Sequence, residues 1–155
     1  MNGTDSHPVP YIAAVGELYN NVRHLGYPLA RFVTGLALMP HGSQKLFGWF
    51  GGNPEAAAAF FDKIGISPGS FWIVVVGCIE FFGGALLALG FLTRLGAGAI
   101  CIAMLVATFH VHIGNGIFWT KGGFEYPLLL ALLALAFFIR GGGDLSIDKK
   151  IGKEL

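Results

Sequence analysis

Charged residues are scarce in this sequence. Asp, Glu, Lys and Arg supply 12% of its 155 residues, whereas a soluble domain carries about 25%. Hydrophobic residues reach 54% and the mean hydropathy is +0.66, which together favour a membrane protein in contact with the lipid bilayer. The formal net charge is only +1, so we expect no nucleic-acid partner and no acidic one.

Cysteine is scarce too, with Cys78 and Cys101 each inside an apolar run. No C-x-x-C motif occurs, which argues against a disulfide-exchanging membrane enzyme. We interpret both cysteines as small packing residues. The opening stretch MNGTDSHPVPYIAAVG lacks a basic segment followed by a long apolar one, so we expect no cleavable signal peptide.

Long apolar runs, by contrast, are prominent. A hydrocarbon core about 30 Å thick needs roughly 20 helical residues, and four segments reach or approach that length. We predict membrane spans at about residues 28–50, 71–92, 95–114 and 125–140. The link between the second and third spans is so short that these helices should be antiparallel neighbours. The predicted fold class is therefore an all-α membrane protein with a four-transmembrane-helix antiparallel bundle.

Basic residues and tryptophans indicate how these spans are oriented. Four spans place both ends of the chain on one side, and seven of the ten Lys and Arg residues fall on that side. By the positive-inside rule, both termini should be cytoplasmic. Trp49, Trp72 and Trp119 fall at the opposite ends of the first three spans, where tryptophan prefers the membrane–water interface. The two signals agree.

The segments that flank the spans are polar or amphipathic. Residues 1–27 form a cytoplasmic N-terminal segment in which Ile12, Val15, Leu18 and Val22 recur at helical spacing. This pattern predicts a short amphipathic helix at the membrane interface, and an exposed helix with accidental periodicity is the alternative. Residues 141–155 form a polar cytoplasmic tail.

Ionisable side chains interrupt the spans at similar depths, in the middle or outer half of the membrane. His41, Gln44 and Lys45 share one face of the first span, because they are three or four residues apart. Glu80 lies in the second span and is costly to expose to lipid, so it should face the bundle interior and pair with His41, Lys45 or His110. A polar pocket in the outer half of the bilayer follows from this convergence.

We therefore assign candidate roles to these residues. His41, Glu80 and His110 are candidate catalytic groups, and the candidate ligand-binding residues are Gln44, Lys45, His112, Asn115 and Glu125. A purely structural ion pair or hydrogen-bond pair that sets helix register is an alternative. A metal site is another, but no metal-specific spacing such as H-E-x-x-H occurs, and no metal is predicted.

Several blocks in order make the chain similar to a known family. They are ARFVTGLALMPHGSQKLFG, CIEFFGGALLALGFLTRLGAGAI, FHVHIGNGIF, GGFEYPLLL and GGGDLSID. In this order they resemble the DoxX family of small four-helix membrane proteins, over about residues 29–148. Family members often carry Pro and Arg in the last block, where this chain has Gly142 and Asp144. The resemblance implies a bacterial inner (plasma) membrane and a quinone-linked or oxidative-stress and thiol-related redox system.

Three functions remain open. One is a membrane component of a redox system, a quinone-linked oxidoreductase subunit with quinone as its cofactor or substrate. Because GNG and GGG lie in loops without a strand–helix unit, electrons would come from a protein partner in a larger complex. The second is a non-catalytic anchor or assembly subunit of such a complex. The third is a transporter or proton path, although no inverted repeat is visible.

Overall fold

A computed structural model describes residues 11–154, and in this range the chain forms helices and connecting turns without any strand. Its α-helices are α1 (Ala13–Val22), α2 (Gly26–Phe47), α3 (Pro54–Lys63), α4 (Gly69–Cys78), α5 (Gly84–Leu89), α6 (Thr93–Val106), α7 (Glu125–Arg140) and α8 (Ile147–Ile151). Short 3₁₀ turns lie at Arg23–Leu25, Trp49–Gly51, Ile113–Asn115 and Trp119–Lys121. The all-helical prediction is confirmed.

Two π-helical segments extend the central helices. The segment η3 (Ile79–Gly83) joins α4 to α5, and η4 (Ala107–His112) continues α6. Among the described residues, two of the resulting continuous helices, Gly69–Leu89 and Thr93–Asn115, are long and apolar enough to cross a membrane. The first has 21 residues and is therefore about 31 Å long. These helices coincide with the second and third predicted spans.

The first and fourth predicted spans are helices as well. Helix α2 ends at Phe47 because Gly48 adopts a left-handed conformation with φ of 70°, which glycine accommodates without steric cost. The predicted range of residues 28–50 therefore overruns this helix by three residues. Helix α7 runs from Glu125 to Arg140, and these are the bounds predicted for the fourth span. Its 16 residues span about 24 Å.

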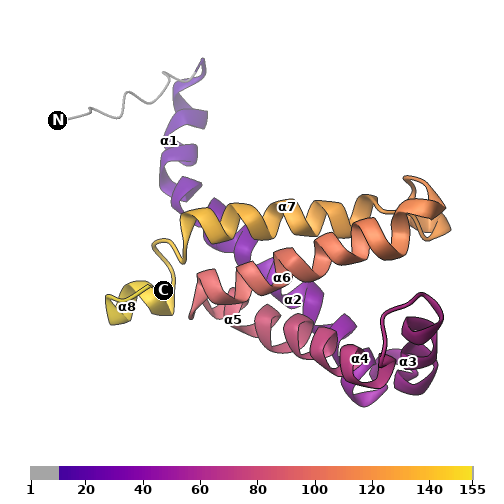
Figure 1. Ribbon diagram of the computed structural model, residues 1–155. Helices are drawn as coiled ribbons and strands as arrows, with labels where there is room; N and C mark the ends of the chain where they lie inside the picture. Colours follow the sequence, from indigo (N-terminus) through magenta and orange to yellow (C-terminus); the bar gives the residue numbers. More distant parts are fainter. Residues whose placement is uncertain (1–10, 155) are drawn as a thin grey trace.

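Glycines bring α2 very close to the helix formed by α4, η3 and α5. A Cβ atom on Gly35 would lie 2.4 Å from the carbonyl oxygen of Gly84 and 2.6 Å from the backbone nitrogen of Ala88. No side chain fits there, so the two backbones touch directly, as small residues allow in membrane helices. Helix α6 packs along α7 and against η3 (Figure 1). The buried core between these helices includes Leu38, Leu87, Ile100, Ala134 and Phe137.

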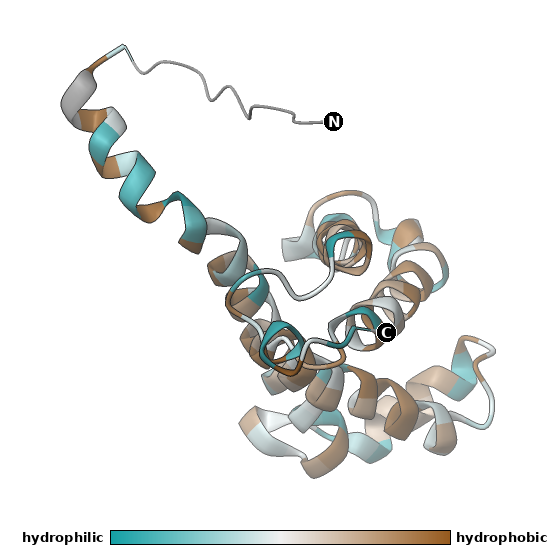
Figure 2. Cartoon of the chain, turned by 90° about the vertical axis from the view of Figure 1, so that its left-hand side faces the viewer, coloured by the Kyte–Doolittle hydropathy of each residue, from teal (hydrophilic) through white to brown (hydrophobic). Residues whose placement is uncertain are grey.

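Large apolar side chains also cover the outside of the packed helices. Leu36 on α2, Ile102 on α6 and Leu132 on α7 are all exposed, and Figure 2 shows hydrophobic residues dominating these helices. In a water-soluble domain, contiguous apolar surface of this kind is rare. The pattern suits helices that are surrounded by lipid.

Helix α1 stands away from the packed helices (Figure 1). It begins and ends within the predicted N-terminal segment, and Val15, Leu18 and Val22 are exposed along it. The predicted amphipathic helix is therefore present, and its place at the membrane interface stays a prediction. Residues 1–10 of that segment lie outside the described residues.

The C-terminal segment folds back onto the ends of the helices. The sequence predicted only a polar tail here, without these contacts. Asp148 accepts hydrogen bonds from the backbone nitrogens of Leu92 and Thr93, at 2.7 and 2.9 Å, and from Thr93 Oγ1 at 2.7 Å. Arg31 is buried and donates from Nη2 to the carbonyl oxygen of Leu145 at 2.7 Å. We call residues 141–154 with these contacts the tail cap.

Candidate functional site

Glu80 and Lys45 form an ion pair inside the packed helices. The distance from Lys45 Nζ to Glu80 Oε2 is 2.6 Å, and the side chains are 23% and 6% exposed, respectively. Lys45 comes from the last turn of α2 and Glu80 from the π-helical segment η3. The prediction that Glu80 faces inward and pairs with one of three named cations is confirmed, with Lys45 as its partner.

Glycines create the space in which this pair forms. A Cβ atom on Gly42 would lie 2.4 Å from the backbone nitrogen of Phe81 and 2.7 Å from the carbonyl oxygen of Gly77. Helix α2 therefore presses against α4 and η3 just beside Glu80. A Cβ atom on Gly77 would lie 3.1 Å from Cβ of Lys45, so the lysine stem runs along the neighbouring helix toward the carboxylate.

Two of the three predicted catalytic groups, Glu80 and His110, lie in π-helical segments. Glu80 lies in η3, and His110 and His112 lie in η4. A π-helical turn holds about one more residue than an α-helical turn, and such turns are frequent at functional sites. The sequence gives no signal for these π-helical turns, because the apolar runs of the second and third predicted spans continue through η3 and η4.

His41 lies beside the ion pair but contacts it through its backbone. Lys45 Nζ is 3.4 Å from the carbonyl oxygen of His41, while the exposed imidazole ring faces Tyr126, with ring centroids 6.0 Å apart. Tyr126 was not among the predicted site residues, although its place in the first turn of α7 put it at the right depth.

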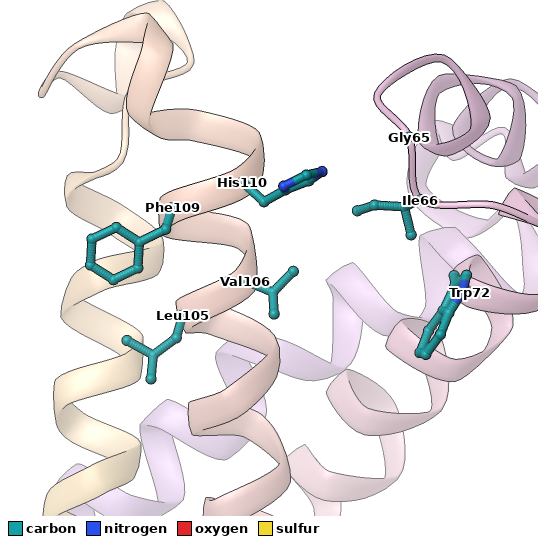
Figure 3. A pocket seen from close by; sticks show the side chains of 7 residues that line it. All are labelled: Gly65, Ile66, Trp72, Leu105, Val106, Phe109 and His110. Atoms are coloured by element: carbon teal, nitrogen blue, oxygen red, sulfur yellow. The ribbon is translucent and has the colours of Figure 1, made fainter.

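His110 belongs to a separate site, which corrects the expectation of one shared pocket. It lines an apolar cleft of about 610 Å³ together with Gly65, Ile66, Trp72, Leu105, Val106 and Phe109. We call this the outer cleft. Figure 3 shows the ring of His110 reaching from η4 toward the segment at Gly65 and Ile66. Its Nε2 lies 3.0 Å from the carbonyl oxygen of Ile64.

The other predicted ligand-binding residues hold the loops at this end of the molecule. His112 Nδ1 lies 2.7 Å from the carbonyl oxygen of Gly122, to which Asn115 also donates at 3.1 Å. Glu125 Oε1 accepts from the backbone nitrogen of Trp119 at 2.9 Å. Gln44 donates to the carbonyl oxygen of Phe50 at 3.2 Å. These groups are engaged within the chain, and their binding of a ligand stays a prediction.

Within residues 11–154, no three His, Cys, Asp or Glu side chains lie close enough together to hold a metal ion. Cys78 and Cys101 are both free thiols of intermediate burial. The chemistry available at the site is therefore that of an ammonium, a carboxylate, an imidazole and a phenol at the end of α2. A second, mainly apolar surface lies in the outer cleft.

Comparison with known proteins identifies relatives of this chain. A protein of Haemophilus influenzae described as uncharacterized is 38% identical over 85 residues, which are 53% of this chain and 63% of that relative. A Bacillus subtilis protein named "Putative oxidoreductase CatD" is 30% identical over 134 residues, 86% of this chain and 92% of the relative. An uncharacterized membrane protein of Mycobacterium tuberculosis is 29% identical over 133 residues, 79% of each chain.

No solved structure matches the chain. The family model described as DoxX matches residues 26–113, a range that includes α2, η3 and η4 and therefore both the ion pair and all the lining residues of the outer cleft. The match extends over more than half of the chain and confirms the resemblance seen in the sequence blocks. The chain belongs to the DoxX family of membrane proteins.

Proposed function

We propose that the chain is a four-span protein of a bacterial inner membrane, in which α2, the α4–η3–α5 helix, α6 and α7 are the spans. The exposed apolar side chains on α2 and α7 support this proposal. Both termini are cytoplasmic in this arrangement, with the tail cap on the inner side. The ion pair and the outer cleft then lie in the outer half of the bilayer, as the positive-inside count requires.

We further propose that this protein is a membrane component of a quinone-linked redox system. The observation that carries the proposal is the Lys45–Glu80 pair, in which a buried carboxylate meets a partly buried ammonium on apolar helices. Ionisable groups within membrane segments are costly and serve mainly as ion, proton or substrate sites. The relative named as an oxidoreductase supports a redox role.

Quinone reduction requires both electrons and protons. Two electrons and two protons convert a quinone to a quinol, and each carbonyl oxygen gains one hydrogen. In this proposal a partner protein supplies the electrons. Lys45 donates a hydrogen bond to a quinone oxygen and Glu80 holds the ammonium in place, so that a proton can pass from this pair to the reduced oxygen. His41 lies beside the pair with its ring facing Tyr126, and these two side chains carry protons from the outer surface.

The test compares three variants in cells that contain no wild-type copy. Glu80→Gln keeps the shape of the side chain and Lys45→Met keeps its length, and each removes one charge. Lys149→Met is the matched control, because Lys149 belongs to an exposed ion pair in the tail cap. We expect the first two variants to lower the protein-dependent rate of quinone reduction at least tenfold, with the control unchanged. Equal rates in all three would refute the proposal.

A non-catalytic assembly role is the second candidate, and helix α1 favours it. The helix stands apart with exposed apolar side chains, a surface on which a partner could pack. Under this function, Glu80→Gln leaves both the complex and its activity intact. Replacement of Val15 and Leu18 by Ser would instead release the partner during purification in mild detergent.

A further inference from the structure

The outer cleft has two side chains that can form hydrogen bonds, His110 and the indole N–H of Trp72, in an otherwise apolar lining. Trp72 from α4 and Phe109 from η4 contribute aromatic rings, while Ile66, Leu105 and Val106 contribute aliphatic groups. Figure 3 shows Val106 and His110 pointing toward Ile66 and Trp72, whereas Leu105 and Phe109 lie on the other side of their helix. The cleft volume of about 610 Å³ lies within the range of pockets that hold small ligands.

The hydrogen bond of His110 determines what the other ring nitrogen can do. Nε2 lies 3.0 Å from the carbonyl oxygen of Ile64, and a carbonyl oxygen can only accept, so Nε2 must carry the proton. In the neutral ring Nδ1 is then an unprotonated acceptor. No hydrogen bond within residues 11–154 involves this Nδ1. Nδ1 of His110 is therefore an acceptor without a donor in this part of the chain.

We propose that the outer cleft binds a membrane-dissolved aromatic alcohol, a phenol or a quinol, whose hydroxyl donates a hydrogen bond to Nδ1 of His110. The ring packs against Trp72, where offset or edge-on aromatic contacts are favourable. A quinone carbonyl offers no proton to Nδ1, so this contact favours the reduced form. That the natural ligand is a quinol rests on the proposed function. The preference for a ligand with a hydroxyl group depends only on the cleft.

A phenol and its methyl ether test this selectivity directly. We would measure saturable binding of radiolabelled 4-nonylphenol to the protein in phosphatidylglycerol–phosphatidylcholine nanodiscs, with empty nanodiscs as background and 4-nonylanisole as the competitor. The two compounds share the ring and the chain, but only the phenol can donate. Loss of one neutral hydrogen bond corresponds to roughly 0.5–1.5 kcal/mol, or about twofold to twelvefold in affinity. We expect the ether to bind more weakly by a factor in this range.

Two variants locate the binding site. Val106→Trp fills the cleft and should abolish saturable binding of both compounds. Ile102→Trp is its matched control, because Ile102 is an exposed residue one turn earlier on α6 and lies outside the lining. It should bind as the wild type does. Circular dichroism of each variant verifies that the helices remain folded.

Two further variants test the hydrogen bond. His110→Phe should bind phenol and ether equally, because the acceptor is gone. His110→Gln offers both an amide donor for Ile64 and a carbonyl acceptor, so it should restore part of the preference. Equal affinities for phenol and ether in the wild type, or unchanged binding in Val106→Trp, would overturn the proposal. Selective binding without quinone-reducing activity would refute the proposed function and leave this inference standing.

Discussion

We predict that removing the charge of Lys45 and removing the charge of Glu80 lower the free energy of unfolding by different amounts. Glu80 is 6% exposed and Lys45 is 23% exposed, so the two groups differ in their access to solvent. Lys45→Met leaves a buried carboxylate without its partner, and we expect a loss of about 3–5 kcal/mol in the free energy of unfolding. Glu80→Gln leaves an oxygen that still accepts from Lys45, whose flexible stem can also extend toward the headgroups. Its cost should be about 1 kcal/mol.

The double variant then separates the pair from its surroundings. In Lys45→Met with Glu80→Gln, no buried charge remains, so the second substitution should recover much of what the first one lost. We expect a coupling free energy of about 2–3 kcal/mol, at the upper end of values for residues in direct contact. The assay is reversible unfolding in mixed micelles of increasing dodecyl sulfate fraction, followed by circular dichroism.

Two results would contradict this reasoning. Equal losses for Lys45→Met and Glu80→Gln would mean that burial does not distinguish the two groups. Additive losses in the double variant would mean that the pair contributes no interaction, despite the 2.6 Å separation. Lys149→Met serves as the control here too. It breaks an ion pair with both side chains mostly exposed, which should change stability by less than about 1 kcal/mol.

Other predictions concern the tail cap, the helix contact and the topology. Burial acts to raise the pKa of Asp148, but the hydrogen bonds from Thr93 and Leu92 and the charge of Arg31 outweigh it and hold that pKa below 3.8. Its stabilising effect is therefore present above about pH 4 and is lost as the pH falls through the lower pKa of the folded state. Asp148→Asn should thus cost about 2–3 kcal/mol at pH 7, and pH-dependent unfolding curves should converge with those of the wild type in acid. Gly35→Val should prevent α2 from packing on α5 and give an aggregated product in size-exclusion chromatography, whereas Gly26→Ala, where a Cβ atom meets nothing within 4 Å, should behave as the wild type. A single cysteine at position 150, in a chain without Cys78 and Cys101, should react with an impermeant maleimide only after the cells are opened, and labelling of intact cells would reverse the topology.

Much of the helical framework can be predicted from the sequence alone. Apolar runs near membrane length identify the helices at residues 69–89 and 93–115, because the bilayer imposes both length and composition on a span. The bounds of α7 also follow from the sequence, since glycines occur shortly before Glu125 and directly after Arg140 and delimit its apolar run. The inward orientation of Glu80 follows from the cost of a carboxylate in lipid.

The arrangement of the site depended on tertiary contacts. The sequence left His41, Lys45 and His110 as possible partners of Glu80. The close packing of α2 against α4 and η3, at Gly42 and Gly77, places Lys45 next to the carboxylate. The π-helical turns altered side-chain directions within η3 and η4, so regular helical spacing could not place His110 and His112. His110 consequently entered a different site from Glu80.

The chain by itself thus determined which segments are helical and which groups could not face lipid, because those properties depend on local composition and on the energy of transfer from water. Only the tertiary structure decided which residues meet. Arg31 illustrates the difference, since the sequence counts it as one more cytoplasmic positive charge, while the fold buries it beneath residues more than a hundred positions away. Such contacts depend on how backbones approach one another, and no local pattern in a single sequence encodes that distance.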